Sequence, residues 1–328
     1  MKRTGLVAVA SVLFATLISG APPTVQWFTF NKAFITSHYA ADSAIGSLTA
    51  TNWVRAKTPH SISCGGQDGE LHIGSFEYEL DVPQGQRPVS SSTGIEDEDW
   101  GVVYELPNAR HGNGPAVLDT IAGRPTTFHG YFRVWNEGHG AGQVWPSNPH
   151  HVLEVHPAWG FASGAVQFDR PDLIGAISGY RGYGIPKFRP IVQAFAQQRW
   201  PRAYQQGERV SVLLGRAENF YQFPVAVRSV RAVTGGEELR LDVYSTAAYT
   251  TTVYEGLRAI VAAGSALAGT FTVGERQTVL GFFSVNLRVA LERSSGASSA
   301  DSSVFVPEVL EFFVFGPTTR PAVSSCSP

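Results

Sequence analysis

Short runs of aromatic and β-branched residues, interrupted by glycine and proline along the whole length, dominate this chain. Its 328 residues include 34 glycines, 20 prolines and 20 phenylalanines, and only 16% are charged. Aromatic and β-branched side chains favour strands, while Gly and Pro favour the turns between them. No heptad repeat persists, and the apolar content is sufficient for a packed core. The pattern predicts an all-β protein and excludes a coiled coil and a disordered chain.

The candidate strands fall into two groups with a Gly- and Pro-bearing connector between them. Four or five precede residue 157, and at least six follow the best helix candidate, residues 190–200. The first group suits a small OB-like barrel, and the second a β-sandwich or a further barrel. We therefore expect a first domain over 22–160, a linker over 161–186, a second domain over 187–316 and a loose tail over 317–328.

The first 21 residues have the pattern of a secretory signal peptide. Lys2 and Arg3 precede an apolar stretch over residues 6–18, and small residues follow it. This stretch is shorter than the ~20 residues of a membrane helix, and no later segment qualifies. The sequence thus predicts a secreted or periplasmic protein without a transmembrane segment. Export permits a disulfide between Cys64 and Cys326, and two unpaired thiols are the alternative.

Histidine is confined to the first half of the chain. All nine histidines lie between positions 38 and 156. Residues 21–156 also carry 14 Asp and Glu against 7 Lys and Arg, whereas residues 157–328 carry 13 against 16. Imidazole and carboxylate groups are common ligands of divalent metals. We therefore expect a divalent metal ion in the first domain. The basic surplus of the second half is too small to predict a nucleic-acid partner.

Two motifs place acidic residues and histidines on one strand face. In DGELHIG, an extended backbone aligns Asp68 with His72, although a turn with a solvent-facing polar side is the alternative. In NPHHVLEVHP, Glu154 and His156 share one face, about 7 Å apart along the backbone. The neighbouring Leu153 and Val155 would face a core, which puts Glu154 and His156 on the opposite surface or in a pocket. His150, roughly 20 Å from His156 on a straight strand, cannot share an ion with it.

Two further strands contribute candidates. Glu105 lies in the otherwise apolar run VVYELP, where an inward carboxylate requires a cation, a proton or hydrogen bonds. An edge strand with Glu105 in water is the alternative. His129 begins HGYFRVWNEGHG, in which alternation puts His129, Tyr131, Arg133 and Trp135 on one face. Such a face can stack on a ligand or lie half-buried.

The ordered set of motifs resembles uncharacterised exported bacterial proteins that carry an Asp-Gly-acidic-x-His segment and a Glu-x-His-Pro ending on an OB-like barrel. The matching positions are Asp68, Gly69, Glu70, His72, Glu105, Pro107, Glu154, His156 and Pro157. Glu70 replaces a second Asp of that pattern, and Ala158 replaces a branched apolar residue. The resemblance covers residues 55–160 and implies no established activity. The barrel opening is also similar to that of staphylococcal-type nucleases, whose arginine pair has no clear match here.

Three hypotheses follow, and whether the chain is an enzyme stays open between them. The first is a secreted metal-dependent hydrolase, with phosphodiesterase as the candidate reaction and a small molecule or polymer as substrate. Its proposed metal ligands are Asp68, His72 and His156, and its proposed catalytic residues are Glu105, His129 and Glu154. The second is a non-catalytic exported protein that presents Trp135, Tyr131, Trp145 and Trp159 to polysaccharide or a protein partner. The third is a hydrogen-bonded network that fixes strand register.

Overall fold

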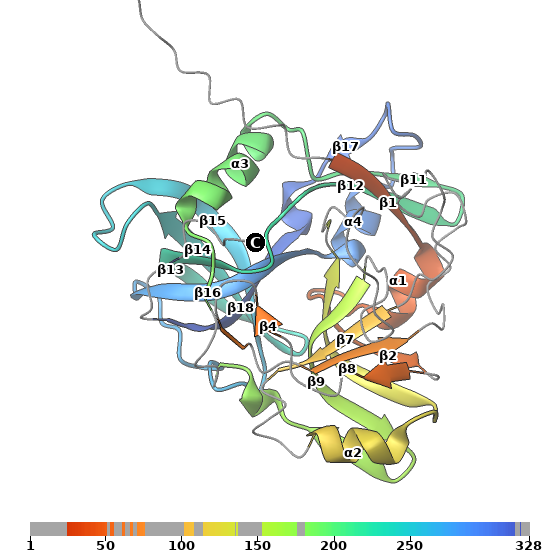
Figure 1. The fold of residues 1–328 in the computed structure, drawn as a ribbon. Helices are drawn as coiled ribbons and strands as arrows, with labels where there is room; N and C mark the ends of the chain where they lie inside the picture. Colours follow the sequence, from red (N-terminus) through yellow and green to blue (C-terminus); the bar gives the residue numbers. More distant parts are fainter. Residues whose placement is uncertain are drawn as a thin grey trace, which may run out of the picture.

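The computed structural model describes residues 25–50, 53–55, 61–62, 66–67, 71–75, 102–107, 114–134, 136, 153–175, 181–318 and 322. Strands predominate and the helices are few and short, which confirms the all-β prediction. The described strands form two open sheets, a closed barrel and a two-stranded ribbon of β4 (Ser61–Ile62) and β5 (Gly66–Gln67). Figure 1 shows the barrel beside the sheet that contains β7, β8 and β9.

A seven-stranded sheet holds most of the first half of the chain. Its spatial order is β2 (Ile45–Ala50), β8 (Thr126–Val134), β9 (Leu153–Ser163), β7 (Val102–Leu106), β6 (Leu71–Ser75) and β3 (Trp53–Arg55), with β10 (Val166–Asp169) on β9. The central pair, β7 and β9, runs parallel, whereas β8 runs antiparallel to β9. Both faces of β9 are buried from Leu153 to Phe161. A short turn connects the helix α2 (Gly114–Ile121) to β8.

The second sheet joins the start of the described chain to its second half. Its order is β1 (Val25–Asn31), β12 (Arg209–Gly215), β11 (Arg202–Gln206) and β17 (Val304–Phe305). Helix α1 (Lys32–His38) follows β1 directly, and the Asn31 side chain caps it by accepting a hydrogen bond from the Ala33 backbone N–H. The predicted boundary between two domains is therefore crossed by a seven-residue antiparallel pairing of β1 with β12.

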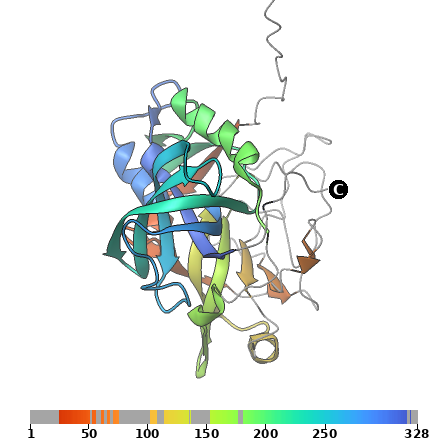
Figure 2. The ribbon, with the colours of Figure 1, turned by 90° about the vertical axis from the view of Figure 1, so that its left-hand side faces the viewer.

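The closed barrel is built entirely from the second half. It consists of β13 (Tyr221–Val233), β14 (Gly236–Tyr244), β15 (Thr252–Ala262), β18 (Leu310–Pro317) and β16 (Arg276–Val285). Gly235, with a φ of +79°, makes the left-handed turn between β13 and β14, as the Gly235-Gly236 hairpin signal indicates. Helix α3 (Ile185–Ala196) lies along the outside of the barrel (Figure 2), and α4 (Leu287–Arg293) follows β16.

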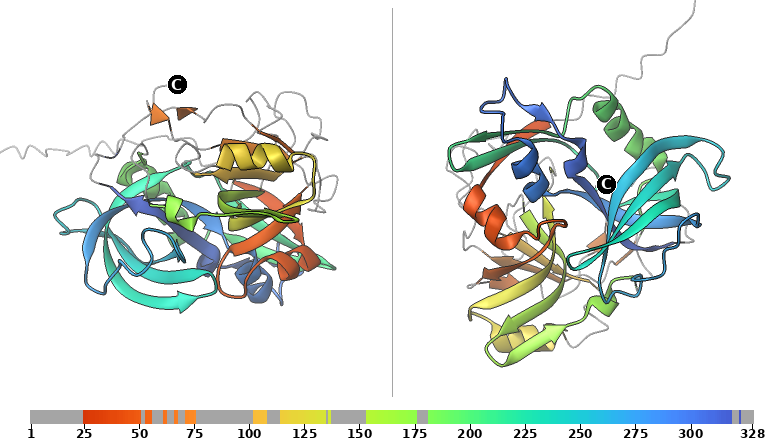
Figure 3. Two further views of the ribbon diagram at one scale, coloured as in Figure 1. Left: turned by 90° about the horizontal axis from the view of Figure 1, so that it is seen from below. Right: turned by 180° about the vertical axis from the view of Figure 1, so that it is seen from behind.

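Three sequence expectations need correction in the described residues. The strands of the first half form an open seven-stranded sheet where we expected an OB-like barrel, whereas the closed barrel of the second half agrees with the β-sandwich or barrel expected there. The first part of the expected linker, 161–186, is a β-hairpin that contains the end of β9 and all of β10. Gly164, with a φ of +59°, reverses the chain between these two strands. The main apolar cluster includes residues of the seven-stranded sheet, the four-stranded sheet and the barrel, so the two halves pack together, while a second apolar cluster lies wholly in the second half. Figure 3, which views the molecule from below and from behind, also shows the seven-stranded sheet beside the barrel.

Candidate metal centre

Glu105, Glu154 and His156 meet inside the seven-stranded sheet. The parallel register pairs Val103 with Glu154 and Tyr104 with Val155, so the next residue of β7, Glu105, comes level with His156. Glu154 and His156 are two residues apart on β9 and therefore share a face. Residues 51 positions apart in sequence are thus brought together by the strand pairing alone.

The three side chains are close enough to share one ion. His156 Nδ1 lies 3.0 Å from Glu105 Oε2 and 3.2 Å from Glu154 Oε2. One ligand atom from each residue fits within 4.8 Å of the others, and no other group of three His, Cys, Asp or Glu residues does so in the described chain. The relative exposures of Glu105, Glu154 and His156 are 6%, 1% and 0%. Carboxylate oxygens with an imidazole nitrogen are a donor set that Zn²⁺, Mn²⁺ and Fe²⁺ accept.

Arg133 completes what we call the buried cluster: Glu105, Arg133, Glu154 and His156. It lies opposite Glu154 in the β8–β9 register, and its Nη1 donates to Glu154 Oε2 at 2.9 Å. The same Nη1 lies 3.2 Å from His156 Nδ1, while Nη2 donates to the Asn219 carbonyl oxygen at 3.3 Å. Two ionised carboxylates and one guanidinium leave a net charge of −1. A proton on His156 would bring this charge to zero, and a bound divalent cation would bring it to +1; either one would place a positive charge beside the buried carboxylates.

Aromatic rings from the second half cover the cluster. The His156 ring centroid lies 4.7 Å from that of Phe282, 5.8 Å from Phe220 and 6.1 Å from Phe315. The Arg133 guanidinium carbon stands 4.7 Å above the centre of the Phe282 ring. Such an apolar cover lowers the local dielectric constant and strengthens each charge interaction beneath it. The sequence placed Glu154 and His156 either on the surface opposite the core or in a pocket, and the surface alternative is wrong, because β9 is packed on both faces.

The other proposed site residues lie elsewhere or are only partly described. The backbone of His72 on β6 pairs in register with Glu105, next to the cluster. Asp68 lies outside the described residues, as do both cysteines. His129 faces another direction: its Nδ1 lies 2.9 Å from Ser47 Oγ, and its ring meets Trp159 edge-on at 5.3 Å. Burial lowers the pKa of His129, and the nearby Asp169 offsets this only in part.

Arg133 is the functional residue whose role the sequence did not reveal. Alternation grouped it with His129 and Tyr131, but register shifts between β8 and β9 interrupt the alternation at residues 129–132. Arg133 and Tyr131 are both fully buried, whereas His129 is half-buried. The available signal was an arginine placed between Phe132 and Val134 in an apolar strand. A buried guanidinium in such a place requires a carboxylate partner.

A second buried charged network ties the sheet to the barrel. Glu311 on β18 accepts hydrogen bonds from Tyr131 Oη at 3.0 Å and from Asn286 Nδ2 at 2.6 Å, and it pairs with Arg258. Arg258 Nε also lies 2.7 Å from Glu238 Oε2. Burial raises the pKa of Glu311, and Arg258 opposes that rise. This network contains no histidine, and its two carboxylates, Glu238 and Glu311, are both paired with Arg258.

Comparison with known proteins returns no relative for this chain. No family model matches it, and no curated protein or solved structure is significantly similar. Among the described helices, none has the length and apolar character needed to span a membrane.

Proposed function

We propose that the protein is an exported metal-dependent hydrolase whose divalent cation is held by Glu105, Glu154 and His156. The observation that carries this proposal is the meeting of three ligand atoms within 4.8 Å on two parallel strands. Export rests on the leader pattern of residues 1–21. Phosphodiester hydrolysis on a small molecule or polymer is the candidate reaction, because a bound cation lowers the pKa of its water and polarises a phosphoryl oxygen.

The residues around the cluster suit such a site. Arg133 holds Glu154 Oε2 at 2.9 Å, which orients this carboxylate as an outer partner orients a metal ligand. The backbone of His72, a metal ligand proposed from the sequence, pairs in register with Glu105 across β6 and β7. The negative excess of the cluster favours a cation over an anion. His129 is excluded from this proposal, since its ring nitrogen is engaged by Ser47.

Metal analysis combined with thermal unfolding tests the proposal. The purified protein should contain close to one equivalent of a transition metal, and a chelator should lower its melting temperature. The variants Glu105→Gln and His156→Ala should lose the metal, whereas the control His129→Ala should keep it. Hydrolysis of a bis-aryl phosphodiester should vanish with the chelator and return with the metal. A metal-free protein that is indifferent to chelators would end the hydrolase proposal.

The position of Arg133 favours a second candidate role for the buried cluster, in which it binds no metal and stabilises the fold. Arg133 Nη1 lies within 3.2 Å of both Glu154 Oε2 and His156 Nδ1, close to the space a cation would occupy. One proton on His156 would then neutralise the cluster and fix the register of β7, β8 and β9. The same metal analysis separates the two roles. By contrast, Tyr131 and Trp159 give no support to the hypothesis of an aromatic binding face, because they are 0% and 4% exposed, while its other two residues, Trp135 and Trp145, lie outside the described residues.

A further inference from the structure

A cavity of about 330 Å³ lies between α3 and the chain that links β12 to β13. Lys187 and Ile191 line it from α3, and Arg216, Glu218 and Tyr221 line it from the opposite side. No member of the buried cluster lines it. Its volume falls in the range typical of sites for small organic ligands.

The charges on the cavity wall are predominantly positive. Lys187 Nζ lies 2.6 Å from Glu218 Oε1, so the single carboxylate of the lining is already matched by one cation. Arg216 is exposed and makes no ion pair within the described part of the chain. The lining therefore carries one unmatched guanidinium, the side chain best suited to bind a carboxylate or phosphate in a bidentate manner.

Two buried donors stand on the same wall. Trp200 is 2% exposed, and its indole Nε1 has no hydrogen-bond acceptor in the described structure. The Tyr221 hydroxyl accepts a hydrogen bond from the Glu218 backbone N–H at 2.9 Å, which leaves its own hydrogen to donate. Burial raises the pKa of Tyr221, so this hydrogen is retained at neutral pH. Buried donors of this kind nearly always have an acceptor, whether from protein, water or ligand.

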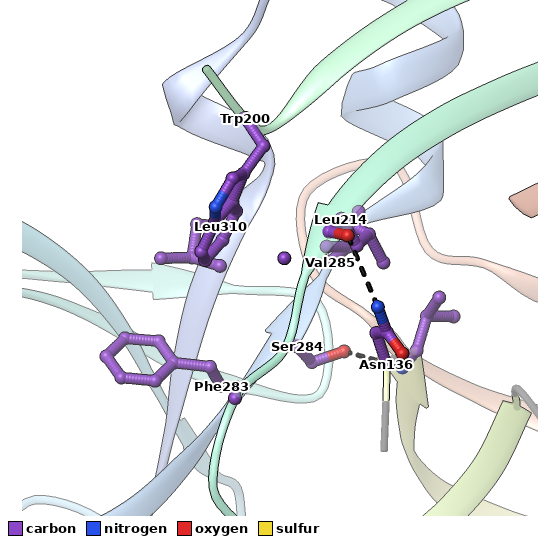
Figure 4. Close-up of a pocket in the computed structure, with 10 residues that line it drawn as sticks. Asn136, Trp200, Leu214, Phe283, Ser284, Val285 and Leu310 are labelled. Carbon is purple, nitrogen blue, oxygen red and sulfur yellow. Dashed lines mark hydrogen bonds between the residues drawn. The ribbon is translucent and has the colours of Figure 1, made fainter. Parts of the chain in front are cut away.

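Trp200 also borders a smaller and more apolar cavity of about 20 Å³. Figure 4 shows this space with Phe283, Val285 and Leu310 around it. The indole lies against Gly215, where a Cβ atom would collide with Nε1 and Cε2. The space is sufficient for a group about the size of one water or methyl. Trp200 thus lines both the larger cavity, with its donors and cations, and the small apolar one.

We propose that the larger cavity binds a small organic oxyanion, a carboxylate or a phosphate monoester. Arg216 and Lys187 meet its charge, and the Trp200 N–H and the Tyr221 O–H donate to its oxygen atoms. This binding does not depend on a metal in the buried cluster. The two sites are nevertheless neighbours, because Asn219, between Glu218 and Phe220, accepts a hydrogen bond from Arg133.

Calorimetric titration at constant ionic strength tests this site, with propionate, inorganic phosphate and uncharged propionamide as probes. Propionate or phosphate should bind, and propionamide should bind at least about tenfold more weakly, because charge-assisted hydrogen bonds are the stronger ones. Stronger binding of phosphate than of propionate would identify a phosphate ester as the ligand class, and the reverse order a carboxylate. The chelated protein should give the same constants as the untreated protein.

Three variants assign the binding to this cavity. Arg216→Gln should weaken binding of the preferred anion at least about tenfold, and Trp200→Phe, which keeps the ring and removes the N–H, should weaken it severalfold. Arg209→Gln, which alters an exposed arginine at the other end of β12, should leave binding unchanged. The proposal is overturned if neither anion binds at millimolar concentration, or if Arg216→Gln and Arg209→Gln bind alike.

Discussion

His156 Nδ1 lies 3.0 Å from Glu105 Oε2, and the two residues belong to neighbouring parallel strands in the interior of the protein. Parallel neighbours need a long connection, and here 46 residues separate the end of β7 from the start of β9. The contact is therefore a product of the tertiary fold. Its stability depends on every charge of the buried cluster having a partner, which makes the cluster sensitive to single substitutions.

Replacement of Arg133 by Met should destabilise the protein strongly. The change leaves Glu154 buried without its 2.9 Å guanidinium contact, and loss of one partner of a buried ion pair costs about 3–5 kcal/mol. Urea unfolding at pH 7 measures the loss. Arg124→Met, at an exposed turn position before β8, is the matched control and should change the unfolding free energy by less than about 0.5 kcal/mol. Equal effects of the two variants would contradict the assigned role of Arg133.

The sequence predicted that Glu154 and His156 share one face of a strand, but it could not predict their surroundings. Alternation correctly put Glu154 and His156 on one face, because strand periodicity is a local property. The parallel pairing with Glu105, the Phe282 cover and the pairing of β1 with β12 depend on contacts between distant segments. Those contacts leave no local pattern, so composition and periodicity could not indicate them.

Local signals also explain two errors in the second half. The alternation of the sequence predicts a strand over Thr278–Glu292, but β16 ends at Val285 and α4 follows. Asn286 ends the strand and begins the helix, since its Oδ1 accepts hydrogen bonds from the backbone N–H groups of Arg288 and Val289 at 3.0 and 3.1 Å. Helix α3 begins at Ile185, five residues before the predicted start, and Pro190 lies inside it. Asn286 is a residue type that favours helix N-caps, and the apolar run around it masked that signal.

Glu238 should make the protein lose stability in acid. Burial alone would raise its pKa, but hydrogen bonds and charges from Arg231 and Arg258 prevail and hold the pKa at about 2. A carboxyl with a depressed folded-state pKa stabilises above its unfolded value, and that contribution disappears as the pH falls toward 2. Melting temperatures measured from pH 5 to pH 2.5 should fall less steeply for Glu238→Gln than for the unmodified protein. The exposed Glu208→Gln is the control, and its profile should follow that of the unmodified chain.

The effect of His129 on stability should change with pH in the opposite direction from that of a histidine that gains a carboxylate partner. Burial lowers its folded-state pKa below the usual 6.5, so the unfolded chain binds the proton more readily. The contribution of His129 to stability is therefore fully present above about pH 7, and it is lost as the pH falls through 6.5 toward the folded-state pKa. The variant His129→Gln should remove this decline, measured as the slope of unfolding free energy against pH between 7 and 5. An unchanged slope would show that His129 is freely solvated.

Gly215 should be intolerant of a side chain because of Trp200. A Cβ atom at this position would collide with the buried indole, whose ring already packs edge-on against Phe195 at a centroid distance of 5.4 Å. Gly215→Ala should thus cost about 1–3 kcal/mol of unfolding free energy, as overpacking of a tight interior usually does. It should also shift the Trp200 fluorescence and weaken oxyanion binding in the adjoining cavity. Gly296→Ala has open space around the new methyl group and should alter none of these measurements, so similar losses in both variants would disprove the close approach of Trp200 to Gly215.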